Sequence, residues 1–143
     1  MGYKKILVPI NGTKVDEEVI GLACRLAKIS KAEIYAAYVI ELERSLPLDA
    51  EVASEVEKGE KALDMAEKIA RSYNYGVETD LLQARDVGPA LLDEALERKV
   101  DLIIIGLSYK TRFGEFSLGS TVPYLLKNAP CRVMIYREPR PSS

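Results

Sequence analysis

The chain contains no histidine and no tryptophan, and it has only two cysteines. Histidine is the commonest general base near neutral pH and a frequent metal ligand, so its absence removes the usual routes to acid–base and metal chemistry. Cys24 and Cys131 lie far apart in the sequence and have no histidine to activate them, so we interpret them as reduced structural thiols. The composition therefore favours a binding protein over an enzyme.

No pair of carboxylates stands out as catalytic either. We interpret the acidic run at 16–18 and the pair Asp93 and Glu94 as solvated charges on helix faces. Asp16 also lies where it could cap the first helix or oppose its positive end. We identify no base that would activate water for hydrolysis.

Other features that the sequence lacks exclude whole classes of partner. The formal net charge is −2, so there is no basic surplus of the kind that nucleic-acid binding requires. No apolar stretch reaches the roughly 20 residues of a membrane span. The first residues lack the long apolar segment of a secretion signal. We therefore expect a cytoplasmic protein whose partners include neither nucleic acid nor membrane.

Apolar runs and amphipathic segments alternate along the 143 residues. We expect strands at 5–10, 33–40, 77–82, 101–105 and 132–136, and helices at 16–29, 49–73, 86–98 and 121–128. This alternation favours right-handed crossovers and a parallel sheet covered on both faces. The predicted class is α/β, a three-layer, doubly wound, five-stranded parallel sheet with strand order 3-2-1-4-5 or its relative 2-1-3-4-5. We expect one domain over residues 1–138 and a frayed tail at 139–143.

The segment from Gly106 to Thr121 carries the most functional information. It follows the apolar run at 101–105, contains Gly119, and ends where Ser120 opens a short helical pattern. The amides of a first helical turn have no partner inside the helix, and the helix dipole favours an anion there. In the order 3-2-1-4-5, the winding reverses between the first and fourth strands, so this segment meets the turn at 11–13. We expect a phosphate group at that place.

Several features of this segment also have an ordinary structural interpretation. Ser120 could serve only as a helix N-cap, and Lys110 and Arg112 could be solvated cations rather than partners of a phosphate. The spacing from Gly114 to Gly119 is that of a Walker loop, but Ser120 stands where the lysine should be. We regard that last match as coincidental.

The chain resembles the universal stress proteins along its whole length. The similarity is carried by Lys5–Thr13, Gly106–Ser120 and Asn128–Ile135. The nucleotide motif of that family is Gly, two residues, Gly, nine residues, Gly, and then Ser or Thr. Gly106, Gly119 and Ser120 match its first, third and last positions.

The resemblance implies the adenine-nucleotide alpha-hydrolase-like version of the fold and a regulatory role in the stress response. It also implies that ATP binds at the motif, with any accompanying Mg²⁺ held mainly by phosphates and water. The residues that we assign to the nucleotide on this basis are Pro9, Ile10, Asn11, Val39, Gly106, Tyr109, Gly119, Ser120 and Thr121.

The chain departs from the family motif at two positions. Tyr109 replaces the second glycine, and Asn11 stands where the family usually has an aspartate. Tyr109 could narrow the pocket or turn its ring outward, whereas Asn11 keeps an acceptor for a ribose hydroxyl and adds a donor. The alternative function is a nucleotide-independent, dimeric interaction module whose pocket Tyr109 blocks. A flavodoxin-like carrier or phosphate-ester enzyme is disfavoured, because the first loop lacks the hydroxyl-rich run that a flavin phosphate would need.

The last predicted strand bears on self-association. In the order 3-2-1-4-5, Arg132–Tyr136 is an apolar edge strand without lysine or proline, and such an edge is usually covered. Pairing with its own copy across a twofold axis would give a homodimer, which the resemblance also implies. Alternatively, the charged tail at 137–140 folds over the edge.

Overall fold

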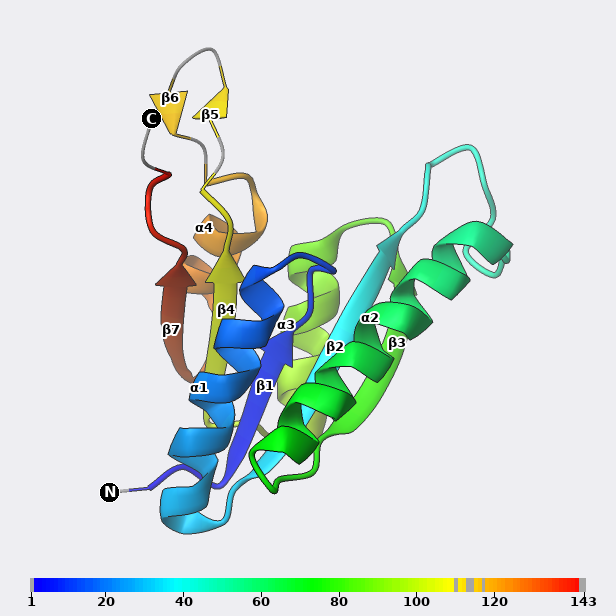
Figure 1. Cartoon of the computed structure of the whole chain (residues 1–143). Coiled ribbons are helices and arrows are strands. Elements are labelled where there is room, and N and C mark those ends of the chain that lie inside the picture. The colour runs from blue at the N-terminus through cyan, green and yellow to red at the C-terminus, as the bar shows by residue number, and fades with distance from the viewer. Residues whose placement is uncertain (1, 110, 113–114, 117, 142–143) are drawn as a thin grey trace.

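The computed structural model describes residues 2–109, 111–112, 115–116 and 118–141. Five parallel strands form its main sheet, in the order β3-β2-β1-β4-β7 (Figure 1). The strands are β1 (Lys5–Pro9), β2 (Glu33–Glu41), β3 (Glu78–Ala84), β4 (Leu102–Leu107) and β7 (Arg132–Arg137). The helices are α1 (Val15–Ser30), α2 (Ala53–Ser72), α3 (Val87–Arg98) and α4 (Thr121–Asn128). Because β7 is the fifth strand of this sheet, the predicted order 3-2-1-4-5 is confirmed.

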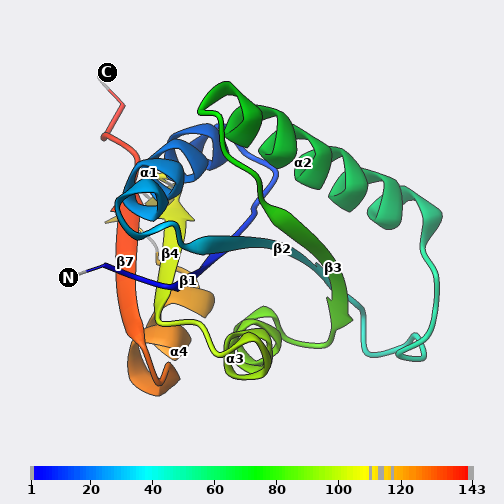
Figure 2. The same cartoon turned by 90° about the horizontal axis from the view of Figure 1, so that it is seen from below.

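Helices cover both faces of the sheet, with α1 and α2 on one side and α3 and α4 on the other (Figure 2). Successive strand residues point to opposite faces, so Ile104 belongs to one apolar cluster, whereas Ile103 and Ile105 belong to the other. Burial on both faces explains why β4 begins with the aliphatic run Leu102–Ile105. In the part of the chain that the structure describes, no helix has the length and apolar character needed to cross a bilayer.

The ends of several elements differ from those that the sequence predicts. α2 begins at Ala53 rather than near Asp49, because the chain is still extended at Val52, its N-cap. β4 continues to Leu107, since its pairing with β7 persists as far as Arg137. An antiparallel pair of very short strands, β5 (Thr111–Arg112) and β6 (Glu115–Phe116), is not predicted from the sequence.

The pairing between β1 and β4 is the feature that positions the candidate functional site. β1 pairs with β2 along its full length, but it pairs with β4 only at Ile6↔Leu102 and Leu7↔Ile103. Beyond these pairs β1 stays with β2, while β4 stays with β7 as far as Leu107. The sheet therefore divides at its carboxyl edge, where the winding reverses and where doubly wound sheets hold their ligands.

Candidate functional site: a cavity at the carboxyl edge of the sheet

A cavity of about 400 Å³ opens where β1 and β4 separate. Its volume lies within the range of small-molecule sites. The lining residues are Pro9, Ile10, Asn11, Thr13, Ala37, Tyr38, Val39, Val87, Leu91, Ile105, Gly106, Leu107, Ser108, Leu118, Gly119, Ser120, Thr121 and Val122. The structure thus brings eight of the nine residues assigned from the sequence around one hollow. The ninth, Tyr109, does not line it.

The buried carboxylate of Asp16 holds the loop after β1 through hydrogen bonds to its backbone. The Oδ1 atom of Asp16 accepts a hydrogen bond from the backbone N–H of Asn11 at 2.9 Å, and Oδ2 accepts one from Gly12 at 2.7 Å. Gly12 has a φ of +77°, a conformation that favours glycine. Asp16 is only 7% exposed, and the N-cap of α1 is Lys14, so both the solvated and the capping interpretations of Asp16 are wrong. Burial raises the pKa of the Asp16 carboxyl, against the opposing effect of these backbone hydrogen bonds.

Asn11 links the two walls of the cavity. Its side-chain Nδ2 donates a hydrogen bond of 2.9 Å to the carbonyl oxygen of Gly106, at the far end of β4. A carboxylate at position 11 has no proton to donate, so this bridge depends on the amide. A second bridge joins the same loops, because the Ser108 hydroxyl lies 3.3 Å from that of Thr13. The departure from the family aspartate therefore has a structural role here.

The first turn of α4 forms the wall that suits an anion. Gly119 precedes it with a φ of +71°, and nothing lies within 4 Å of the position that a Cβ would take. Ser120 occupies the N-cap position, but its side chain makes no capping hydrogen bond. Asp16 already accepts the Asn11 and Gly12 amides of the opposite loop. The first turn of α4 is therefore the part of the wall that suits an anion, because first-turn amides have no partner inside the helix and the helix dipole adds to their effect.

Gly106 is a glycine for a different reason. A Cβ at this position would lie 2.7 Å from Cγ2 of Val19 and 3.2 Å from Cγ1 of Val15, both on α1. Real Cβ atoms do not approach other atoms so closely, so β4 and α1 are packed too tightly here for any side chain. The first glycine of the motif is therefore required by packing in this chain.

Gly106→Ala is expected to lower the free energy of unfolding by about 1–3 kcal/mol, the usual cost of overpacking. Urea unfolding of Gly106→Ala, of Val19→Ala and of the two substitutions combined measures this. The second substitution removes the methyl that the new Cβ would strike, so the double variant should lose less stability than the two single losses added together. Gly76→Ala is the control, because nothing lies within 4 Å of its Cβ position. Strict additivity of the two losses would contradict the packing argument.

Tyr109 faces away from the cavity toward the end of β7. The guanidinium carbon of Arg137 lies 5.1 Å from the centroid of its ring, and its backbone N–H donates to Oε1 of Glu138 at 2.8 Å. This placement matches the outward-turned ring and gives no support to a pocket plugged by tyrosine. Lys110 lies outside the described residues, as does the side chain of Arg112.

Sequence reasoning missed part of the cavity wall. Val87 and Leu91 reach it from the start of α3, and nothing in their local sequence distinguishes them from ordinary core residues. Thr13 and Ser108 lie in the two segments that the sequence predicts to meet where the winding reverses, although neither was assigned to the nucleotide individually.

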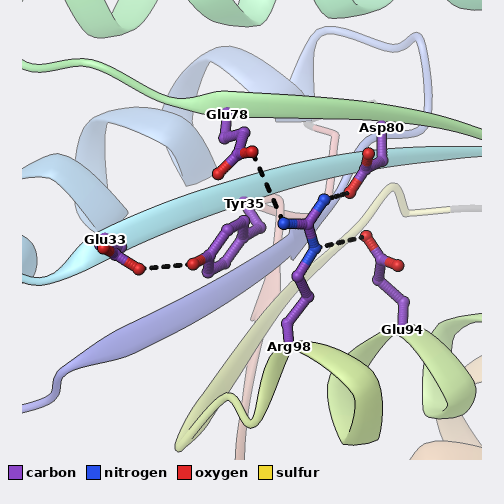
Figure 3. A network of polar contacts seen from close by, with 6 residues as sticks. All are labelled: Glu33, Tyr35, Glu78, Asp80, Glu94 and Arg98. Carbon is purple, nitrogen blue, oxygen red and sulfur yellow. Dashed lines mark hydrogen bonds and ion pairs between the residues drawn. The ribbon is translucent and has the colours of Figure 1, made fainter.

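A second group of charges lies further along α3 (Figure 3). Arg98 Nη2 is 2.6 Å from Oδ2 of Asp80 on β3, and its guanidinium lies over the ring of Tyr35 at 4.7 Å. Glu94 Oε2 is 3.6 Å from Arg98 Nε and makes no hydrogen bond within the described part of the chain. Glu94 is 6% exposed, so its interpretation as a solvated charge is wrong.

The environment of Glu94 changes its acidity. Burial, followed by the adjacent Asp80 carboxylate, raises the pKa of Glu94 to about 7. Burial opposes ionisation of Asp80 as well, but its interactions with Glu94 and Arg98 prevail and lower the pKa of Asp80. Among the described residues there is no cluster of three or more His, Cys, Asp or Glu side chains that could hold a metal ion.

The sequence and the fold were compared with those of known proteins. Residues 2–137 match the Universal stress protein family. A universal stress protein of Methanocaldococcus jannaschii is 32% identical over 144 residues, covering 96% of this chain and 84% of the relative. The structure of a universal stress protein from Archaeoglobus fulgidus superposes with a TM-score of 0.78 at 20% identity, covering 93% of this chain and 98% of that one. Another, described as the universal stress protein from A. fulgidus in complex with dAMP, gives 0.73 at 21% identity, covering 94% and 98%. Because the family model matches residues 2–137 and a relative is 32% identical along almost the whole chain, the chain belongs to the universal stress protein family.

Proposed function

We propose that this protein binds an adenine nucleotide, with ATP as its ligand, in the cavity between β1 and β4. The observation that carries the proposal is the cavity wall at Gly119–Thr121. There Gly119, with a positive φ, precedes a helix whose N-terminus has no side-chain cap. This wall lies where the winding of the sheet reverses. The dAMP complex of a relative with the same fold supports the choice of an adenine nucleotide.

The cavity offers different surroundings to the two ends of such a ligand. Ala37, Val39 and Leu91 form an apolar side that suits an adenine ring, while the first turn of α4 suits the phosphates. Asn11 and Thr13 lie between them within reach of a ribose. Any Mg²⁺ would be held mainly by phosphate oxygens and water. Because no described side chain at the cavity is placed as a base, we propose binding rather than turnover, in a cytoplasmic stress-response regulator.

We also propose that β7 pairs with its own copy in a homodimer. β7 is the edge strand of the sheet, and Ile135 on it is 38% exposed. An apolar edge strand of this kind is a template for further pairing. Equilibrium sedimentation of the wild-type protein and of Ile135→Lys tests this idea. A monomer at every concentration in the wild type would contradict it.

Gly119→Val is expected to weaken ATP binding at least about tenfold, equivalent to about 1.4 kcal/mol. A β-branched residue is strained at a φ of +71°, and its side chain would stand at the anion-binding wall. Isothermal titration calorimetry with ATP and AMP measures the loss. Gly119→Asn separates the two causes, since asparagine tolerates the left-handed backbone but still adds a side chain.

Gly76→Val is the matched control, because Gly76 has open space around it and does not line the cavity. Circular dichroism should show that each variant is folded. Unchanged affinity in both Gly119 variants would remove this wall from the site. A flat titration of the wild-type protein with every adenine nucleotide would favour the nucleotide-independent interaction module instead.

A further inference from the structure

The chain after β7 stays hydrogen-bonded to the end of β4. The backbone N–H of Glu138 donates a hydrogen bond of 2.9 Å to the carbonyl oxygen of Leu107, which lines the cavity. Its carboxylate Oε1 accepts a hydrogen bond of 2.8 Å from the backbone N–H of Tyr109. One half-buried residue thus holds the chain on both sides of Ser108, another residue of the cavity wall.

Arg137 adds to this attachment, because its guanidinium lies over the ring of Tyr109. The amide and the ring of Tyr109 are therefore both held by consecutive residues of the segment that ends the sheet. A glycine at position 109, as in the family motif, would present no ring to Arg137. In this chain the second motif position serves as an attachment point for the C-terminal segment.

The opposite wall of the cavity is held in a similar way. The carboxylate of Asp16 accepts hydrogen bonds from the backbone N–H groups of Asn11 and Gly12, in the loop after β1. In both walls a carboxylate outside the cavity fixes backbone that lines it or adjoins it. Fixing the backbone before the ligand arrives reduces the ordering cost of binding, so such residues raise affinity without touching the ligand.

We propose that Glu138 is a positioning residue of the nucleotide site, which fixes the wall formed by Gly106–Ser108 through the amide of Tyr109. This inference rests on the proposed function. It assigns a ligand-directed role to a residue that lies beyond β7 and outside the nucleotide motif.

A simple charge effect predicts the opposite result and can be separated from positioning. If Glu138 acted only as a negative charge near the phosphates, removing that charge would strengthen ATP binding. If it acts by holding the Tyr109 amide, Glu138→Gln should keep most of the affinity, because the glutamine carbonyl still accepts a hydrogen bond. Glu138→Ala should then lose affinity, because it has no acceptor.

The test combines calorimetry with ATP and amide hydrogen exchange of Tyr109 in the ligand-free full chain. We expect Glu138→Ala to bind ATP about fivefold or more weakly and to exchange the Tyr109 amide faster, with Glu138→Gln within about twofold of the wild type in both measurements. Glu97→Ala is the charge-matched control, because Glu97 is exposed and does not line the cavity.

Three results would overturn the inference. They are unchanged affinity in Glu138→Ala, tighter ATP binding in both Glu138 variants, or exchange of the Tyr109 amide that does not change in Glu138→Ala. Failure of the proposed function looks different, because the wild type itself would then bind no adenine nucleotide. In that event the exchange measurement still decides whether Glu138 fixes the Tyr109 backbone.

Discussion

Asp16→Ala is expected to lower the free energy of unfolding by about 2–3 kcal/mol. A hydrogen bond to a charged group is worth about 1.5–3 kcal/mol, and Asp16 accepts two of them, from Asn11 and Gly12. The expected loss is smaller than the sum of the two hydrogen-bond energies, because burial disfavours the charged carboxylate and raises the pKa of Asp16. Urea unfolding at neutral pH measures the difference.

Two further variants make this experiment decisive. Asp16→Asn keeps one acceptor but presents an N–H₂ group to the second amide, so its stability should fall between alanine and wild type. Glu17→Ala is the control, since Glu17 is the exposed neighbour on the same helix turn. If Asp16→Ala were as stable as Glu17→Ala, the first loop would hold its shape without the carboxylate. If the proposed function is correct, Asp16→Ala also weakens ATP binding, because the loop carries Asn11 and Thr13.

Glu94→Gln is expected to remove a pH dependence of stability between about pH 5 and pH 8. The pKa of Glu94 is raised from its ordinary value of 4.5 to about 7 in the folded protein. Over this interval the folded state binds more protons than the unfolded state, so the free energy of unfolding falls as pH rises. The protonated Glu94 contributes fully below its unfolded pKa, and that contribution is lost as pH passes through the folded pKa. The difference between the two values corresponds to about 3 kcal/mol at most.

Neutral glutamine has no such loss, so at pH 8 the variant should be more stable than the wild type, while near pH 5 the two should be similar. Urea unfolding across this pH range provides the measurement. Asp80 does not interfere, because its lowered pKa affects stability only at more acidic pH. Asp93→Asn removes the same charge from an exposed site on α3 and should keep the wild-type slope. Parallel pH profiles for wild type and Glu94→Gln would show that Glu94 is not held protonated.

The sheet order was predictable because each of its parts has a local signal. Uninterrupted aliphatic runs such as Leu102–Ile105 indicate strands buried on both faces, and the amphipathic helices between them imply parallel pairing. The position of the cavity followed from this order, because the winding reverses at only one place. The antiparallel pair β5 and β6 escaped prediction because strands of two residues carry no periodic pattern.

The roles of individual acidic and glycine residues were not predictable from spacing. Asp16 stands beside exposed Glu17, and Glu94 stands beside exposed Asp93, so their burial depends on tertiary partners. Accounting for the backbone amides of the tight turn at Asn11 would have pointed to a nearby acceptor such as Asp16. Gly106 and Gly119 are equivalent in the motif, yet packing requires one and backbone conformation the other.

The early end of the β1–β4 ladder has a consequence for how the cavity can be altered. The hollow opens where two backbones diverge after only two paired positions, so its place in the sheet is set by the backbone. Substitutions on its walls can alter the size, polarity and charge of the molecule that fits, while eliminating the hollow would require re-registering strands in the middle of the sheet. The size and polarity of the hollow can therefore be altered at wall positions that carry ordinary side chains, such as Val39 and Leu91, whereas Gly106 is fixed by its packing and Gly119 by its backbone conformation.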